Sequence, residues 1–143
     1  MVGNVPGADT VRSMTLDPAL HQLATAKNFA ALTTLMADGQ PQTQIMWVHA
    51  DDDHLIINTE TGRQKFRNVE RDPRVTVTVF DAANPYRYAE ARGRVVETEA
   101  GAVARADIDE LSQKYTGGPY GNPIGTERVI LRIAVDKVHK NGI

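Results

Sequence analysis

Apolar and polar residues alternate along several short stretches of this chain, and such alternation is typical of β-strands with one buried face. The clearest example lies near the C-terminus, where every second residue from 129 to 135 is a branched aliphatic one. Other stretches, at 29–35, 41–49, 54–59, 75–79 and 86–97, are apolar or alternating and are separated by short turns. Six strands with short connections predict an antiparallel sheet closed on itself, that is, a small β-barrel.

Local signals place turns and helices around these strands. Asp38-Gly39 predicts a tight hairpin turn between the first two strands, and Gly93 predicts a bulge in the fifth. Asp17-Pro18 is a typical helix start, because an aspartate can cap the helix and proline suits its first position. Helical spacing also occurs over 63–71 and over 104–115. The prediction is a mainly β fold with flanking helices.

Length and composition indicate one globular domain. The chain has 143 residues, of which 41% are hydrophobic and 24% charged, so it can bury a core of its own. Residues 1–14 are small, polar and unpatterned and are predicted to form a flexible leader, with the domain at 15–143. The absence of cysteine excludes a disulfide framework, a thiolate metal site and a cysteine nucleophile.

Charge and hydropathy bear on location and partners. No apolar run approaches the roughly 18 residues of a membrane span, and the first residues do not resemble a signal peptide, so a cytoplasmic protein is expected. A sequence pI near 6.1 gives no general attraction to nucleic acid. The four histidines show no metal-ligand spacing, and the aspartates at 51–53 are better explained by a turn than by a calcium loop, so no metal site is expected.

The segment 58–74 is the most informative stretch for function. Its sequence, N-T-E-T-G-R-Q-K-F-R-N-V-E-R-D-P-R, carries five basic residues and three acidic ones in a chain of net charge -2. A strand that leads into a cationic helix start brings backbone N–H groups, a helix dipole and cationic side chains to one point, and a phosphate is the anion that such a point attracts. The alternative is a solvated basic helix end, which this segment alone slightly favours.

The predicted strand 86–97 provides a second indication. Tyr86 and Tyr88 share a face with charged residues, whereas the opposite face is small and apolar and suits the interior of a narrow barrel. Two outward tyrosines could cover a subunit partner or a flat ligand. The equally weighted alternative is that they only shield the barrel surface.

Motifs for nucleophilic catalysis, for a Rossmann dinucleotide site and for a P-loop do not occur in the sequence. A phosphate-binding corner on a barrel without such a motif indicates a site in which a bound cofactor supplies the chemistry. No catalytic side chain can be named from the sequence.

Three strings of the sequence resemble a known family: L-T-T-L-M-A-D-G-Q-P-Q from Leu32, T-x-x-G-R-Q-K-F-R-N-V-E-R-D-P-R from Thr59, and Y-R-Y-A-E-A-R-G-R-V from Tyr86. The motifs D-G-x-P, K-x-x-N and R-D-P-R occur together in the split β-barrel superfamily of flavin and deazaflavin oxidoreductases, called pyridoxamine 5'-phosphate oxidase-like. The resemblance is to its branch that binds coenzyme F420, an 8-hydroxy-5-deazaflavin with a phospholactyl-polyglutamate tail. It implies a six-stranded split barrel of the FMN-binding type and a homodimer.

The resemblance also implies roles for particular residues. Arg63 and Lys65 would hold the cofactor phosphate, and Thr59 and Asn68 would add hydrogen bonds there. The implied cofactor-binding set comprises Gln42, Gln44, Thr59, Gly62, Arg63, Lys65, Asn68, Tyr86 and Tyr88. The two glutamines would contact the ring system, and the two tyrosines would reach the cofactor from the second subunit.

One departure from the family pattern narrows the function. True pyridoxamine phosphate oxidases carry an arginine and a lysine on the second strand, where this chain reads Q-T-Q-I-M-W-V-H from Gln42. The departure disfavours vitamin B6 oxidation and tight FMN binding. The resemblance therefore implies an F420-dependent oxidoreductase that transfers a hydride to an unsaturated small-molecule acceptor.

Three alternatives stay open: an FMN-dependent enzyme of the same fold, a non-catalytic F420 carrier, and a haem protein, for which no axial histidine is evident. A preference for F420 would also draw on its negatively charged tail, which Arg67, Arg71 and Arg74 are expected to attract.

Overall fold

The computed structural model describes residues 14–143, so the predicted leader lies outside the described residues except for Met14. The chain folds into helices and strands in the order α2 (Pro18–Thr25), β1 (Phe29–Leu35), β2 (Pro41–Met46), β3 (His49–Ala50), β4 (Leu55–Glu60), α3 (Gln64–Arg71), β5 (Arg74–Phe80), β6 (Tyr88–Ala100), α4 (Ala102–Thr116) and β7 (Arg128–Asn141). The mainly β fold with flanking helices is confirmed.

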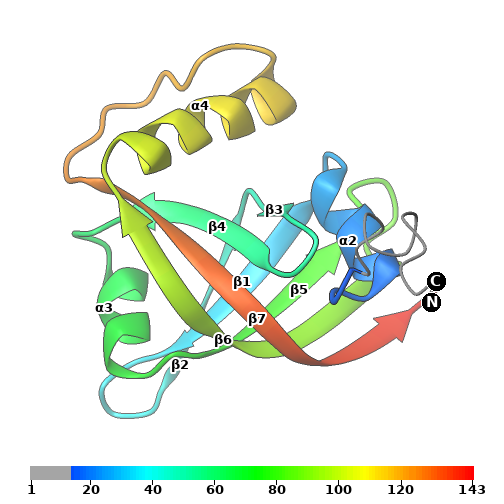
Figure 1. The fold of residues 1–143 in the computed structure, drawn as a ribbon. Coiled ribbons are helices and arrows are strands. Elements are labelled where there is room, and N and C mark those ends of the chain that lie inside the picture. The colour runs from blue at the N-terminus through cyan, green and yellow to red at the C-terminus, as the bar shows by residue number, and fades with distance from the viewer. Residues whose placement is uncertain (1–13) are drawn as a thin grey trace, which may run out of the picture.

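The strands form one antiparallel sheet that wraps around the core (Figure 1). Its order is β2-β1-β5-β6-β7-β4-β3, which gives seven strands rather than the six predicted. The prediction of a closed sheet is also wrong, since the edge strands β2 and β3 are not hydrogen-bonded to each other. The gap between them, at Trp47 and Val48, is called the seam below.

The seam has a physical cause in helix α4. The stretch 41–49 was expected to be one strand, but it stops at Met46 and resumes at His49. The Val48 N–H donates to the Tyr115 hydroxyl at 3.1 Å, and the Val48 carbonyl accepts from Lys114 Nζ at 2.7 Å. Because two α4 side chains satisfy this peptide, it is not available to pair with a strand.

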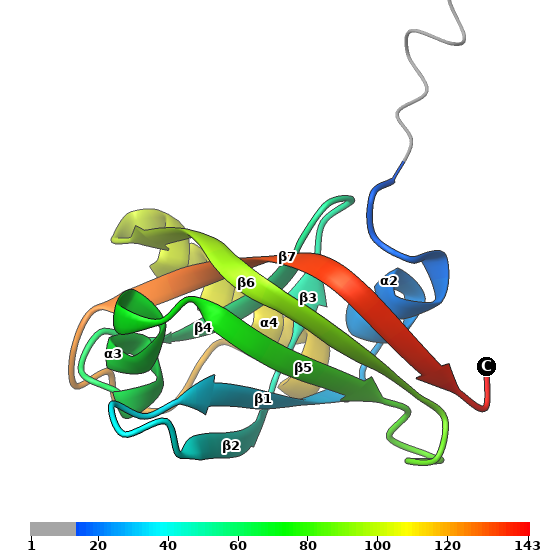
Figure 2. The same ribbon diagram turned by 90° about the horizontal axis from the view of Figure 1, so that it is seen from below.

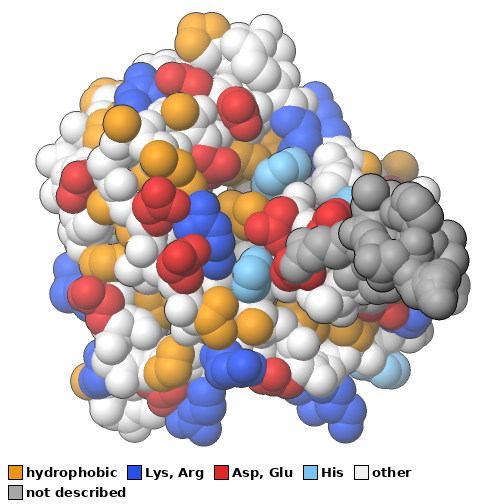
Figure 3. All heavy atoms as spheres, in the orientation of Figure 1, with side chains coloured by type: hydrophobic (Ala, Val, Ile, Leu, Met, Phe, Trp, Pro, Cys, Tyr) orange, Lys and Arg blue, Asp and Glu red, His pale blue; other side chains and the backbone are white. Residues whose placement is uncertain are grey.

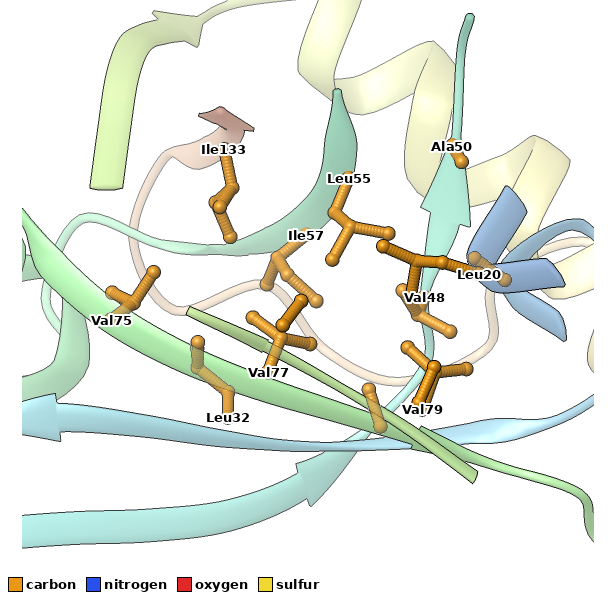
Figure 4. Close-up of a cluster of buried hydrophobic side chains, with 14 of the residues drawn as sticks. Leu20, Leu32, Val48, Ala50, Leu55, Ile57, Val75, Val77, Val79 and Ile133 are labelled. Atoms are coloured by element: carbon orange, nitrogen blue, oxygen red, sulfur yellow. The ribbon is translucent and has the colours of Figure 1, made fainter. Parts of the chain in front are cut away.

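The core lies between the curved sheet and α2, and its aliphatic side chains point toward one another (Figure 4). Ala89 and Ala91 are buried on the inner face of β6, as predicted for a narrow interior. The bulge predicted at Gly93 is confirmed by a register shift between Arg92 and Gly93. A Cβ on Gly93 would lie 2.0 Å from the Ala134 carbonyl oxygen, so only glycine fits there.

Helices α2, α3 and α4 occupy different places around the sheet (Figures 1 and 2). Helix α2 begins as predicted, because the Asp17 carboxylate accepts from the N–H groups of Ala19 and Leu20 at 2.9 and 3.1 Å. Helix α4 ends at Gly117, whose φ of 79° is left-handed. It packs over β4, β6 and β7, whereas α3 follows β4 and packs on β1.

The fifth predicted strand starts two residues later than expected. Tyr86 lies in the turn before β6, and it is 78% exposed. The Tyr86 N–H donates to Asn84 Oδ1 at 3.2 Å, and the Arg87 N–H donates to the Asn84 carbonyl at 2.9 Å, so these two residues belong to the turn and not to the strand. Tyr88 is the first residue of β6 and lies near the His139 ring.

Charged groups are dispersed over the surface. On the face seen in Figure 3, acidic and basic side chains are interspersed. Within residues 14–143, no helix has the length and apolar character needed to cross a membrane.

Candidate functional site

A cleft of about 320 Å³ lies beside the seam, between the end of β2, strand β4 and helix α4. Its walls combine cationic, amide and apolar side chains. They are Gln44, Ile45, Met46, Trp47, Asn58, Thr59, Arg63, Lys65, Ile108, Leu111, Tyr120, Asn122 and Arg128. The open edge of the sheet and the cleft therefore coincide.

Lys65 provides a buried cation at one end of the cleft. Its side chain lies in the first turn of α3 and is 7% exposed. Within residues 14–143 its ammonium group has neither a hydrogen-bond acceptor nor an ion-pair partner. Burial lowers the pKa of Lys65, and the charges of Arg63 and Arg128 lower this pKa further. A buried lysine among other cations is costly unless an anion binds it.

Arg128 and Arg63 meet at the same carboxylate. Arg128 is 6% exposed, and its guanidinium lies 3.3 Å from Glu60 Oε2. Arg63 NH2 lies 3.2 Å from the same oxygen. Three cations and one carboxylate leave a net charge of two positive units at this end of the cleft. This balance favours a bound anion.

Arg128 is held rigidly in place. Its Nε donates to Asn58 Oδ1 at 2.9 Å, and its guanidinium lies 5.2 Å from the centre of the Tyr120 ring. Asn58 in turn donates to Asp107 on α4 at 2.9 Å. A guanidinium fixed on three sides presents its remaining donors in one direction, which suits recognition of a phosphate or carboxylate.

Thr59 adds an unsatisfied hydroxyl to the same end. Its side chain is 3% exposed, and its Oγ1 is the buried side-chain oxygen without a hydrogen-bond partner among the described residues. Buried hydroxyls are normally paired, so an unpaired one that lines a cleft marks a place where a ligand can supply the partner.

Aromatic side chains form the other end of the cleft. Trp47 stacks on Tyr115 with ring centres 5.0 Å apart and planes 2° from parallel. Tyr120 meets Trp47 edge-on at 6.2 Å. The Tyr115 hydroxyl donates to the Asn28 carbonyl, which anchors the stack to the residue that precedes β1. The cleft thus offers a fixed aromatic wall next to its cationic end, which suits a flat molecule that carries an anionic group.

The structure brings together four of the residues implied by the resemblance: Gln44, Thr59, Arg63 and Lys65 all line the cleft. Asn68 does not line it. That residue is fully buried behind Lys65, and its amide donates to Thr34 Oγ1 at 2.9 Å and to Gln42 Oε1 at 3.3 Å. Asn68 and Gln42 thus tie α3 to β1 and β2 beneath the site.

Gly62, Tyr86 and Tyr88 also do not line the cleft. The Gly62 N–H donates to Thr126 Oγ1 at 3.0 Å, and a Cβ at this position would lie 2.8 Å from the Thr126 side chain. The two tyrosines lie at the turn between β5 and β6. Their predicted contact with a cofactor bound to a second subunit stays a prediction.

Several lining residues were not found from the sequence. Arg128 is the first residue of β7, and its partner Glu60 is distant in the chain, so no local pattern identified it as a site residue. Tyr120 and Asn122 lie in the connection from α4 to β7, residues 117–127, called the 117–127 loop below. The sequence of this segment contains no signal for which residues face the cleft.

The outer arginines of segment 58–74 are engaged elsewhere. Arg67 donates to the Gly62 carbonyl and to Gln64, each at 2.8 Å, and Arg71 donates to the Leu35 carbonyl. Arg74 pairs with Asp72 at 2.8 Å, and this pairing lowers the pKa of Asp72 to about 2. Of the basic residues in the segment, Arg63 and Lys65 line the cleft.

Comparison with known proteins agrees with this description. Residues 16–142 match the family model described as pyridoxamine 5'-phosphate oxidase. A solved structure described as an F420 reductase is 31% identical, with a TM-score of 0.76, and the match covers 88% of this chain and 100% of that one.

Two further solved structures share the fold. A conserved hypothetical protein from Mycobacterium tuberculosis is 23% identical, with a TM-score of 0.68 over 90% of this chain and 86% of that one. The general stress protein 26 from Bacillus anthracis is 18% identical, with a TM-score of 0.64 over 86% of this chain and 91% of that one.

The chain therefore belongs to the pyridoxamine 5'-phosphate oxidase-like family of split-barrel flavin and deazaflavin proteins, which confirms the resemblance. Within this family it is similar to a protein described as an F420 reductase. The fold is that of an oxidoreductase of the flavin and deazaflavin type.

Proposed function

We propose that this protein is an F420-dependent oxidoreductase that binds its deazaflavin in the cleft beside the seam and reduces an unsaturated organic acceptor. The observation that supports the proposal is the combination, in one cleft, of the Lys65 ammonium and the Thr59 hydroxyl, two buried groups without a partner among residues 14–143. Both fit the phosphate of such a cofactor. When bound, the reduced deazaflavin would supply the hydride.

The residues of the cleft divide the work of binding between them. Lys65, Arg63 and Arg128 would hold the anionic group by charge-assisted hydrogen bonds. The aromatic wall formed by Trp47 and Tyr120 would offer an apolar surface to the ring system of the cofactor and exclude water from it. Gln44 would hydrogen-bond to the ring edge, as the resemblance implies. No general acid is assigned, so solvent or a nearby tyrosine would provide the proton.

The absence of a basic pair on β2 supports the preference for deazaflavin over FMN. Strand β2 carries proline, glutamine, threonine, isoleucine and methionine, and Gln44 is the polar residue that it contributes to the cleft. An FMN-dependent enzyme of the same fold is the alternative, and a non-catalytic F420 carrier is a second one.

The functional assignment can be tested by parallel titrations and a turnover assay. Purified protein is titrated with oxidised F420 and with FMN, and deazaflavin is expected to bind more tightly at physiological salt. Its affinity should fall as salt rises and as the tail is shortened. Stoichiometric co-purification with FMN would replace the proposal by the FMN-dependent one. Binding of F420 without oxidation of its reduced form by any of a panel of unsaturated acceptors would favour the carrier.

We also propose a homodimer, in which Tyr86 and Tyr88 of one subunit approach the cofactor of the other. Tyr86 is 78% exposed and Ile45, on the edge strand β2, is 61% exposed, which is a large apolar area for a monomer's surface. Light scattering at micromolar concentration should give twice the chain mass, and a monomer mass would exclude this assembly. The cytoplasmic location is likewise a proposal, which fractionation of the native cells would test.

A further inference from the structure

Glu60, the last residue of β4, is a buried carboxylate that meets five hydrogen-bond donors. It is 4% exposed. Its Oε1 accepts from the N–H groups of Gly125 and Thr126 at 3.0 and 2.8 Å, and from Thr126 Oγ1 at 3.1 Å. Its Oε2 accepts from Arg63 and Arg128 at 3.2 and 3.3 Å. The hydrogen bond from Thr126 N–H contributes most to holding the pKa of Glu60 below its usual range.

The two oxygens of Glu60 face different parts of the site. Oε1 faces the end of the 117–127 loop, which runs back along α4 to the start of β7 (Figure 1). This loop carries Tyr120 and Asn122, which line the cleft. Oε2 faces the two arginines at the cationic end. One carboxylate therefore connects the loop wall of the cleft to its anion-binding end.

The loop is anchored to β4 at this end by the backbone as well. The Thr61 N–H donates to the Glu127 carbonyl at 2.9 Å, and the Gly62 N–H donates to Thr126 Oγ1. The N–H groups of Gly125 and Thr126 take no part in these bonds and donate to the Glu60 carboxylate instead. Without it, two backbone donors near the cleft would lose their partner.

We propose that Glu60 is a positioning residue for the bound anion: it holds Arg63, Arg128 and the 117–127 loop in the arrangement that accepts the anion, without touching the ligand itself. This role rests on the proposed function only where it names deazaflavin as the ligand. Inorganic phosphate tests the role of Glu60 whether or not the protein binds deazaflavin.

If Glu60 positions the arginines, removal of its charge should change the anion affinity in the direction opposite to the one that net charge predicts. Removing a carboxylate from a cationic site strengthens its attraction for anions if only the net charge matters. If Glu60 positions the arginines, Glu60→Gln should instead weaken binding. The glutamine NH₂ group cannot accept a hydrogen bond, so either the two arginines or the N–H groups of the loop would lose their acceptor and shift. We expect roughly tenfold weaker binding of deazaflavin and of phosphate, the usual size for a lost charge-assisted contact.

Glu70→Gln is the matched control. Glu70 is exposed on α3, so this change alters the net charge by the same amount away from the cleft. It should leave both affinities unchanged or slightly raised. A second variant, Thr126→Val, keeps every charge and removes one donor to Glu60, together with the acceptor of the Gly62 N–H. It should weaken binding about threefold and keeps the test possible if Glu60→Gln does not fold.

Hydrogen exchange of the folded variants provides a readout that does not need the cofactor. The Gly125 and Thr126 amides should exchange faster in Glu60→Gln and in Thr126→Val than in the wild type. Trp47 is the chain's single tryptophan, and its ring should become more accessible as Tyr120 moves away from it. A soluble quencher should therefore reduce its fluorescence more strongly in the variants than in the wild type.

The outcomes separate the two proposals. Weaker phosphate binding with faster exchange supports the role of Glu60, even if the wild type binds neither F420 nor FMN and the proposed function fails. Phosphate affinity in Glu60→Gln equal to or above that of Glu70→Gln would overturn the role, whatever the exchange rates. Unchanged amide exchange in both variants would overturn it as well.

Discussion

Lys65 is buried and Lys114 is half-buried, and the surroundings of their ammonium groups differ. Lys114 donates to the carbonyls of Val48 and Ala24 at 2.7 and 3.0 Å, and its Nζ lies 4.7 Å from the centre of the Tyr115 ring. Lys65 has no such acceptors within residues 14–143 and opens into the cleft. Burial alone therefore does not distinguish a structural lysine from a ligand-binding one, whereas the presence of acceptors does.

The largest expected effect is on ligand binding and comes from Lys65→Met. Loss of one charge-assisted contact should weaken deazaflavin binding by about 1.5–3 kcal/mol, or roughly tenfold to a hundredfold. The free energy of unfolding should not fall, because the charge that is removed has no partner in the described part of the chain. Fluorescence titration and urea denaturation measure the two quantities. Lys27→Met, at an exposed position, is the control. Lower stability with unchanged affinity would make Lys65 structural.

Lys114→Met should have the reverse signature. The carbonyls of Val48 and Ala24 would lose a donor, so the free energy of unfolding should fall by about 2 kcal/mol. Deazaflavin affinity should remain within about twofold of the wild-type value, which corresponds to almost no change in binding free energy. The same denaturation and titration experiments apply. A variant that folds as stably as the wild type but binds poorly would show that the two lysines do not divide their roles in this way.

The pH dependence of stability should also distinguish Lys114. Burial lowers the pKa of Lys114 from 10.5 to about 8. Between these values the unfolded chain binds more protons than the folded one, so the contribution of this group to stability rises with pH, by up to about 1.4 kcal/mol per pH unit. The difference in unfolding free energy between wild type and Lys114→Met should therefore grow from about pH 8 to about pH 10. A constant or shrinking difference would contradict this.

The smallest expected effect concerns hydroxyl groups. Thr59→Val removes a buried oxygen that has no partner, so it should raise the free energy of unfolding by about 1 kcal/mol and weaken deazaflavin binding a few-fold. Thr34→Val is the matched comparison, because that buried hydroxyl accepts from Asn68 at 2.9 Å and its loss should destabilise the fold. Equal stability changes in the two variants would show that the Thr59 hydroxyl is paired in solution.

Those parts of the fold that depend on neighbouring residues were predictable from the sequence. The start of α2 follows from the Asp17 cap and the bulge from Gly93, and both are local. The end of β2 was not predictable, because the alternation continues through Val48 while the partners of that peptide come from α4. A residue pattern contains no information about an acceptor or donor so far along the chain.

The candidate site shows the same division. Lys65 and Arg63 belong to one continuous basic segment, so their shared location could be predicted. Arg128 could not, because its position depends on the pairing of β4 with β7, which places Arg128 opposite Glu60. The attraction of Arg67, Arg71 and Arg74 for the cofactor tail stays a prediction, and nothing in their spacing reveals that each finds an acceptor close by.

The seam has a consequence for how such a protein can diversify. Because two side chains of α4 replace a neighbouring strand at Val48, the edge of the sheet at this point depends on Lys114 and Tyr115 and not on a paired strand. Descendants that keep Lys114, Tyr115, Tyr120 and the loop contacts to Glu60 can exchange other residues of this wall, such as Ile108 and Asn122, and so accommodate new acceptors. The cationic end formed by Arg63, Lys65 and Arg128 would stay unchanged, so the acceptor could change while the cofactor stays the same.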